Sequence, residues 1–243
     1  MEGPQHPVND PAEAGLLVPT AQGPGRLLVD VAARPRALLL LGHGAGGGPQ
    51  AADLALLARR LPPRGVTVAR FEQPWRLAGR KVAVRPPQLD EAWLAACGWL
   101  AEQPWAQLPL FTGGRSAGAR VACRTATAVG ARGVLCLAFP LHLPGRPERS
   151  RAPELLAPVV PRVVLQGSRD TFGSSAEVRA AAAADPGVRV VELPGADHSF
   201  RLLRGAEFGP ADLRERVVAE AAALLGLDFG PSAAGAGEGR DGE

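Results

Sequence analysis

The sequence contains no Ile and no Tyr, and it has only one Lys, so nearly all of its 27 basic residues are Arg. Aromatic residues make up 5% of the chain, which leaves little material for the stacking platform that a single-stranded nucleic acid requires. The formal net charge is only +3, and the basic residues are dispersed rather than gathered in runs. A dispersed charge of this size does not indicate a polyanion-binding tail. We therefore expect no nucleic-acid partner.

Cysteine is also scarce. The three residues, Cys97, Cys123 and Cys136, lie in apolar stretches, and no C-x-x-C spacing occurs. An odd number without that spacing argues against both a disulfide framework and a zinc site. We expect three small buried thiols and no metal.

Long apolar segments are missing as well. No uninterrupted apolar run approaches the roughly 18 residues that a membrane span needs. The first residues, MEGPQHPVND, lack the basic and apolar regions of a signal peptide. These absences favour a cytoplasmic protein without a membrane partner.

Composition divides the chain into three parts. Residues 1–14 are Pro-rich and predict a flexible N-terminal segment, whereas residues 230–243 combine Gly, Ala and Ser with charges and predict a disordered tail. Residues 15–229 alternate apolar and turn-forming stretches, and their length suits one domain.

Strands and helices are predicted to alternate through that domain. We expect strands near residues 27–31, 37–41, 66–71, 108–112, 133–139, 162–166 and 188–193, and helices near 49–61, 89–102, 117–128, 174–184 and 210–225. The first strand alternates only weakly and is expected at the sheet edge. Residues 72–88 are expected to be irregular, and residues 140–158 to form a Pro-rich loop with a short helix. The pattern predicts an α/β fold with a mostly parallel sheet, helices on both faces and a minimal cap.

The segment Gly114-Arg115-Ser116-Ala117-Gly118 matches the pattern G-x-S-x-G. The pattern alone is weak, but here it follows a predicted strand and precedes a predicted helix. That context is the one in which a nucleophile elbow presents a serine on a sharp turn. A plain glycine-rich turn is the alternative explanation. We predict that Ser116 is a nucleophile.

A serine hydroxyl needs a base, and the base needs a carboxylate to orient it. His198 lies just beyond the last predicted strand, while His43 and His142 follow earlier strands. The chain order Ser, Asp, His that this architecture uses favours His198 as the base and Asp170 as its partner. Asp197 is adjacent to His198, so we interpret it as a carboxylate that caps the loop.

Two backbone N–H groups are predicted to hold the developing oxyanion. Ala117 follows the nucleophile at a helix start, and Ala45 lies in the glycine-rich stretch at residues 41–48. Phosphate binding by that stretch is a competing interpretation. The stretch lacks the Lys-Ser/Thr of a P-loop and the third glycine of a dinucleotide-binding loop.

These motifs resemble the α/β-hydrolase superfamily from about Ala14 to Leu227. The resemblance is carried by LGHGAGG (41–47), GGRSAGAR (113–120), FPLHLPGRPE (139–148), LQGSRDTFG (165–173) and GADHSF (195–200). More narrowly, the chain is similar to the dienelactone-hydrolase-like branch that includes testis-expressed protein 30 and subunit 3 of the KAT8 regulatory NSL complex. The resemblance implies a fold and a Ser-His-Asp set but no substrate. Phe139 stands where many relatives have Tyr, and Ser116 stands where dienelactone hydrolase has Cys, so dienelactone activity is not implied.

The sequence thus predicts a serine hydrolase that needs no cofactor and acts on a small-molecule ester, thioester or amide as a monomer or homodimer. His43, Trp75, Arg115 and His142 are candidate substrate-binding residues. The cations of residues 76–85 near Trp75 either favour an anionic substrate or belong to a solvated loop. Two other classes stay open, namely a non-catalytic protein-interaction module and a nucleotide binder.

Overall fold

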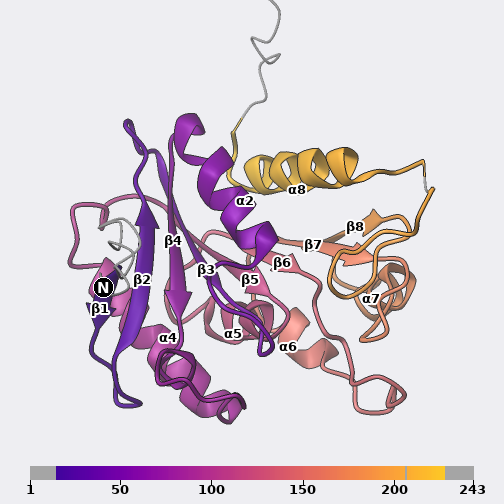
Figure 1. Ribbon diagram of the computed structural model, residues 1–243, viewed down its shortest axis with the longest axis horizontal. Helices are drawn as coiled ribbons and strands as arrows, with labels where there is room; N and C mark the ends of the chain where they lie inside the picture. The colour runs from indigo at the N-terminus through magenta and orange to yellow at the C-terminus, as the bar shows by residue number, and fades with distance from the viewer. Residues whose placement is uncertain (1–14, 206, 228–243) are drawn as a thin grey trace, which may run out of the picture.

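The computed structural model describes residues 15–205 and 207–227. The predicted flexible segment 1–14 and the predicted tail 230–243 therefore lie outside the described residues. Within the described part, eight strands form one sheet in the order β1-β2-β4-β3-β5-β6-β7-β8 (Figure 1). The strands are β1 (Leu16–Val18), β2 (Gly25–Asp30), β3 (Ala37–Gly42), β4 (Val66–Glu72), β5 (Leu110–Arg115), β6 (Val134–Leu137), β7 (Arg162–Gly167) and β8 (Val188–Leu193).

The sheet is mostly parallel. β2 pairs antiparallel with both β1 and β4, and every pair from β4 through β3 to β8 is parallel. Parallel strands place their carboxyl ends at one edge, where the loops that follow β3, β5, β7 and β8 come together. The predicted α/β fold is confirmed.

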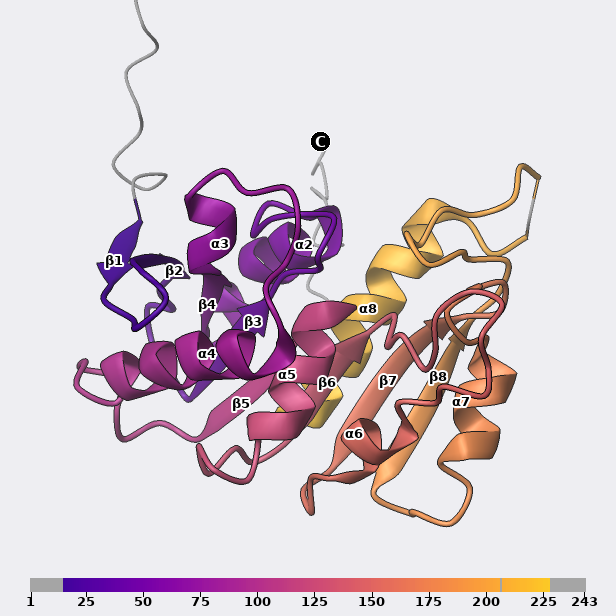
Figure 2. The same cartoon turned by 90° about the horizontal axis from the view of Figure 1, so that it is seen from below.

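Helices cover both faces of the sheet. They are α2 (Ala52–Arg60), a short 3-10 helix at Pro62–Arg64, α3 (Pro74–Leu77), α4 (Pro86–Leu100), α5 (Ala117–Thr125), α6 (Ala152–Leu156), α7 (Ser175–Ala181) and α8 (Pro210–Leu224). Figure 2 shows α4, α5, α6 and α7 in front of the sheet, with α8 behind it. On that rear face, α2 packs against α8.

The pleat of the strands sorts the apolar side chains into two cores. On β3, Leu38 and Leu40 join the core beneath α4 and α5, while Leu39 and Leu41 join the core beneath α2 and α8. Successive side chains of a strand point to opposite faces, so a strand covered on both sides must be apolar at every position. This is why the run Ala37–Leu41 reads as continuously apolar.

Local chemistry fixes where the helices begin. At the start of α7 the Glu177 N–H donates to Ser174 Oγ at 3.3 Å, and the Ser174 N–H donates to the Glu177 carboxylate at 2.8 Å. This reciprocal pair satisfies two N–H groups that the first turn leaves unpaired. α4 and α8 each begin with Pro, whose fixed φ suits the first helical position.

The three cysteines are buried and unpaired, as predicted. Cys123 and Cys136 face each other across α5 and β6 with their sulfurs 3.5 Å apart. Burial raises the pKa of the Cys97 thiol to about 12. The thiols therefore act as small apolar groups.

Two elements differ from the expectation. β1 lies outside β2, so the predicted edge strand at residues 27–31 is an inner strand. β1 has three residues, two of them exposed, and so carries no periodic signal. Residues 72–88 contain α3 and the start of α4, because Pro74 and Pro86 open helices in a stretch that composition suggested was irregular. Among the described residues, no helix combines the length and apolar character that crossing a bilayer requires.

The core packing predicts a contrast between two leucines. Leu39 is 0% exposed, whereas Leu17 on β1 is 63% exposed. Leu39→Ala should lower the free energy of unfolding by about 2–5 kcal/mol, because it removes buried methyl groups and leaves a cavity. Leu17→Ala, the matched control, should change it by less than about 1 kcal/mol. Guanidinium chloride titrations of both variants measure the difference, and equal losses would contradict this account of the core.

Candidate active site

Ser116 lies on the sharp turn between β5 and α5. Its backbone has φ 51° and ψ −110°, a conformation that a non-glycine residue rarely adopts. The Ser116 N–H donates to the Leu137 carbonyl oxygen on β6 at 2.9 Å. The neighbouring strand therefore holds the turn in place, and the strain is stored at the position predicted to be the nucleophile.

Glycines make this turn possible. A Cβ on Gly114 or on Gly118 would collide with the carbonyl oxygen of Gly42 at the end of β3. A Cβ on Gly113 would lie 2.5 Å from the Leu135 carbonyl oxygen on β6. Only glycine lets the start of α5 approach the end of β3 so closely.

A chain of hydrogen bonds begins at Ser116. His198 Nε2 lies 3.0 Å from Ser116 Oγ, and His198 Nδ1 lies 2.7 Å from Asp170 Oδ2. The three residues come from the ends of β5, β7 and β8. A carboxylate on Nδ1 fixes the tautomer in which Nε2 accepts a proton from the hydroxyl. The structure thus brings together the three residues that the sequence selected.

Other groups hold the carboxylate and the imidazole. Asp170 is 3% exposed; its Oδ1 accepts the Phe172 N–H at 2.8 Å, and its Oδ2 accepts Gln166 Nε2 at 2.9 Å. The Phe172 ring packs on the His198 ring with centroids 4.2 Å apart. Asp197 accepts the N–H groups of Ser199 and Arg201, so it caps the loop as predicted.

The loop after β3 lies against Ser116. A Cβ on Gly44 would be 3.5 Å from the Ser116 Cβ. Ala45 and Ala117, the predicted oxyanion donors, line one small cavity together with Trp75. Ala117 occupies the first position of α5, where the N–H has no partner within the helix.

His43 holds this loop. It is buried; its Nε2 accepts the Gln73 N–H at 3.1 Å, and its Nδ1 lies 2.8 Å from the Gly44 carbonyl oxygen. Since Nε2 accepts, the proton sits on Nδ1 and the ring is neutral. Burial lowers the pKa of His43 below its ordinary value of 6.5. His43 also lines the cavity of Ala45 and Ala117. Its hydrogen bond to Gln73 links the loop after β3 to the end of β4.

Arg115 has three partners within the protein. Its guanidinium pairs with Asp53 on α2, donates to the His198 carbonyl oxygen, and lies 4.7 Å from the centre of the Phe200 ring. The side chain is 14% exposed. Arg115 was a candidate for substrate binding, and the structure places it as a tie between α2 and the loop that carries His198.

The structure buries both of the remaining candidates, Trp75 and His142. Trp75 is buried, with its ring 5.7 Å from that of His43. His142 is buried near α7, where its Nδ1 lies 2.9 Å from the Leu143 carbonyl oxygen and its Nε2 lies 3.4 Å from Glu177 Oε1. Arg80 and Lys81 are exposed. Across the described residues, no three His, Cys, Asp or Glu side chains are grouped so that they could hold a metal ion.

Sequence reasoning missed the groups that support the site. Gln166 and Phe172 belong to the stretch LQGSRDTFG, and their spacing of four and two residues from Asp170 is the one signal that points to them. Asp53 is 62 residues from Arg115, and no local pattern links the two. Such contacts follow from the packing of α2 on the sheet.

Comparison with known proteins agrees with the observed fold. A family model described as an alpha/beta hydrolase domain matches residues 35–226. A search of curated proteins found no match.

Solved structures share the fold. A serine hydrolase without a lid from Xanthomonas campestris is 22% identical, with a TM-score of 0.68 over 94% of this chain and 100% of that one. Est1E from Butyrivibrio proteoclasticus with bound ferulic acid is 13% identical, with a TM-score of 0.69 over 87% of this chain and 99% of that one. Dienelactone hydrolase from Anabaena variabilis is 17% identical, with a TM-score of 0.67 over 88% of this chain and 96% of that one.

The lowered pKa of His43 predicts a pH dependence of stability. In the unfolded chain His43 binds a proton near its ordinary pKa of 6.5, whereas the folded protein keeps it neutral to lower pH. The contribution of the neutral His43 to the free energy of unfolding is therefore fully present above pH 6.5, and it is lost as the pH falls below that value. His43→Gln should lose less free energy of unfolding between about pH 7.5 and 5.5 than the wild type does. Denaturant titrations at both pH values test this, and an unchanged loss would refute it.

Proposed function

The chain belongs to the α/β-hydrolase family, and from this premise we propose that it is a serine hydrolase that cleaves a small ester, thioester or amide. The observation that carries the proposal is the continuous chain Ser116, His198, Asp170, with distances of 3.0 and 2.7 Å. The proposal includes membership of the dienelactone-hydrolase-like branch and a cytoplasmic location.

Acylation begins at the serine hydroxyl. Ser116 Oγ attacks the substrate carbonyl carbon while its proton passes to His198 Nε2. The imidazolium that forms is stabilised by the Asp170 carboxylate, which is already oriented by Gln166 and Phe172. His198 then gives the proton to the leaving alcohol, thiol or amine, and an acyl-Ser116 ester remains.

Deacylation reverses the roles. A water molecule gives a proton to His198 Nε2 and attacks the acyl carbon, and the carboxylic acid leaves as the proton returns to Ser116 Oγ. In both steps the N–H groups of Ala117 and Ala45 stabilise the negative oxygen. Pre-aligned donors of this kind contribute about 10²–10³ in rate.

The region after β6 argues for a small substrate. Between β6 and β7 the described chain forms turns and one five-residue helix, α6. A lid over the serine would need a longer insertion with its own helices. The short connection therefore supports a site without a helical lid, which suits a small acyl group.

Replacing the nucleophile tests the proposal. A fluorophosphonate probe should label the wild type, because Ser116 Oγ displaces fluoride from phosphorus, and it should not label Ser116→Ala. Hydrolysis of short p-nitrophenyl esters should fall by about 10⁴-fold or more in the variant. Ser150→Ala, at an exposed serine before α6, is the control and should keep both activities.

Equal labelling of wild type and Ser116→Ala would refute the proposal. If instead no ester, thioester or amide is turned over and a stable partner is isolated, the interaction module becomes the better explanation.

Arg115 gives a second prediction. Arg115→Met removes the link from Asp53 to the His198 loop and should lower kcat by roughly 10²-fold with little change in KM, since a small displacement of the base disrupts proton transfer. Arg120→Met is the matched control, because Arg120 pairs with Glu154 on α6. A rate profile against pH should change shape in Arg115→Met alone. Equal effects of the two variants would assign Arg115 a merely structural role.

A further inference from the structure

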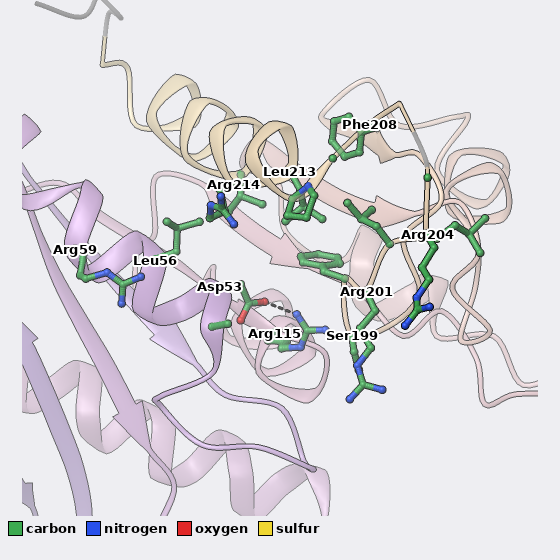
Figure 3. A pocket seen from close by; sticks show the side chains of 18 residues that line it. Asp53, Leu56, Arg59, Arg115, Ser199, Arg201, Arg204, Phe208, Leu213 and Arg214 are labelled. Carbon is green, nitrogen blue, oxygen red and sulfur yellow. Dashed lines mark hydrogen bonds and ion pairs between the residues drawn. The ribbon is translucent and has the colours of Figure 1, made fainter. Parts of the chain in front are cut away.

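A second cavity adjoins the hydrogen-bonded chain. It has a volume of about 740 Å³ and lies between α2, the start of α8 and the loop after β8 (Figure 3). Arg115 and Ser199 line it, and they are the immediate neighbours of Ser116 and His198. One end of the cavity is therefore lined by the sequence neighbours of the proposed nucleophile and base, although Ser116 and His198 themselves do not line it.

The inner wall of the cavity is apolar. Leu56 and Val217 are buried, and Phe200, Phe208 and Leu213 are half-buried. All five belong to or pack against the core beneath α2 and α8. This wall suits an apolar chain, because each buried methylene of a ligand contributes about 0.8 kcal/mol.

The rim of the cavity is cationic. Five arginines line the cavity, namely Arg59, Arg115, Arg201, Arg204 and Arg214, against one carboxylate, Asp53. Arg115 already pairs with Asp53. Figure 3 shows Arg59 and Arg214 on the helices, with Arg201 and Arg204 across the opening on the loop.

The four lining arginines other than Arg115 differ from many others in the protein, because they have no carboxylate partner in the part of the chain that the structure describes. Arg26, Arg60, Arg124 and Arg189, for example, each pair with a carboxylate. Within the described residues, Arg59, Arg201, Arg204 and Arg214 form no ion pair. An apolar wall bounded by cations without partners is complementary to a ligand that has an apolar body and an anionic end.

We propose that this cavity binds the acyl part of the substrate, and that the preferred substrate is an ester or thioester whose apolar acyl chain ends in an anionic group. The inference rests on the proposed function, since it places the scissile carbonyl at Ser116. The acyl chain lies along Phe200 and Leu213, and the anion lies among the guanidinium groups of the rim. The cations of the loop at residues 76–85 are not required.

A pair of substrates that differ in one charge tests the proposal. The mono-p-nitrophenyl ester of suberic acid ends in a carboxylate. The diester in which this carboxylate is converted to a methyl ester is neutral. The wild type should have the higher kcat/KM for the anionic ester, by roughly tenfold, and the preference should shrink in 1 M salt because salt screens exposed charges. A phosphonate-ended ester distinguishes a phosphate-like end group from a carboxylate.

Variants of the rim provide the control. In the double variant Arg201→Gln/Arg214→Gln the ratio of the two kcat/KM values should fall roughly three- to tenfold, as expected for partly exposed ionic contacts. Arg132→Gln removes an exposed arginine that lies just before β6, at the amino ends of the parallel strands. This variant should leave the ratio unchanged. A wild-type ratio near one, or a ratio that the double variant leaves unchanged, would overturn the proposal.

Binding separates this proposal from the proposed hydrolysis. Monomethyl suberate should bind Ser116→Ala more tightly than dimethyl suberate does, and the preference should weaken when Arg201→Gln/Arg214→Gln is added, as measured by calorimetry. Absence of ester turnover together with this binding would refute the hydrolysis and retain the cavity. Turnover together with equal binding of both compounds would retain the hydrolysis and refute the proposal for the cavity.

Discussion

The contact between the end of β3 and the start of α5 is the constraint on which the site depends. Gly42, Gly114 and Gly118 meet there without side chains, and any Cβ on Gly114 or Gly118 would strike the Gly42 carbonyl oxygen. The close approach brings the loop after β3 beside Ser116, where Ala45 and Ala117 line one small cavity. It also forces the turn at Ser116 into its positive φ. The packing of three glycines thus positions Ser116 and the loop that contains Ala45 together.

The base is held by a different kind of interaction. Asp170 is buried among donors from Gln166 and Phe172, and Arg115 ties the carbonyl of His198 to Asp53 on α2. A buried ion pair is valuable here for orientation more than for stability, since desolvation offsets much of its attraction. The residue next to the proposed nucleophile thereby contacts the backbone of the proposed base directly, and α2 supplies the carboxylate that pairs with its guanidinium. Arg115, the residue next to the serine, is therefore in contact with the loop that carries the proposed base.

The charge of the chain gains meaning only from its distribution. A net charge of +3 indicates no partner when the basic residues are counted along the sequence. In three dimensions, arginines from α2, α8 and the loop after β8 gather around one apolar cavity, while many others are paired with carboxylates. A ligand responds to this local excess, because fields around a cavity are set by nearby unpaired charges.

The sequence by itself determined the fold and selected Ser116, Asp170 and His198. Buried parallel strands need continuous apolar runs, and strand-turn-helix junctions need glycines, so both leave marks that are local in the chain. Short elements such as β1 and α3 left no such marks. Only the tertiary structure decided the support of the site and the position of the cationic cavity. Asp53, Arg115, Arg201 and Arg214 line one cavity because α2 and α8 pack on the same face of the sheet. Contacts between such distant segments have no periodicity from which to predict them.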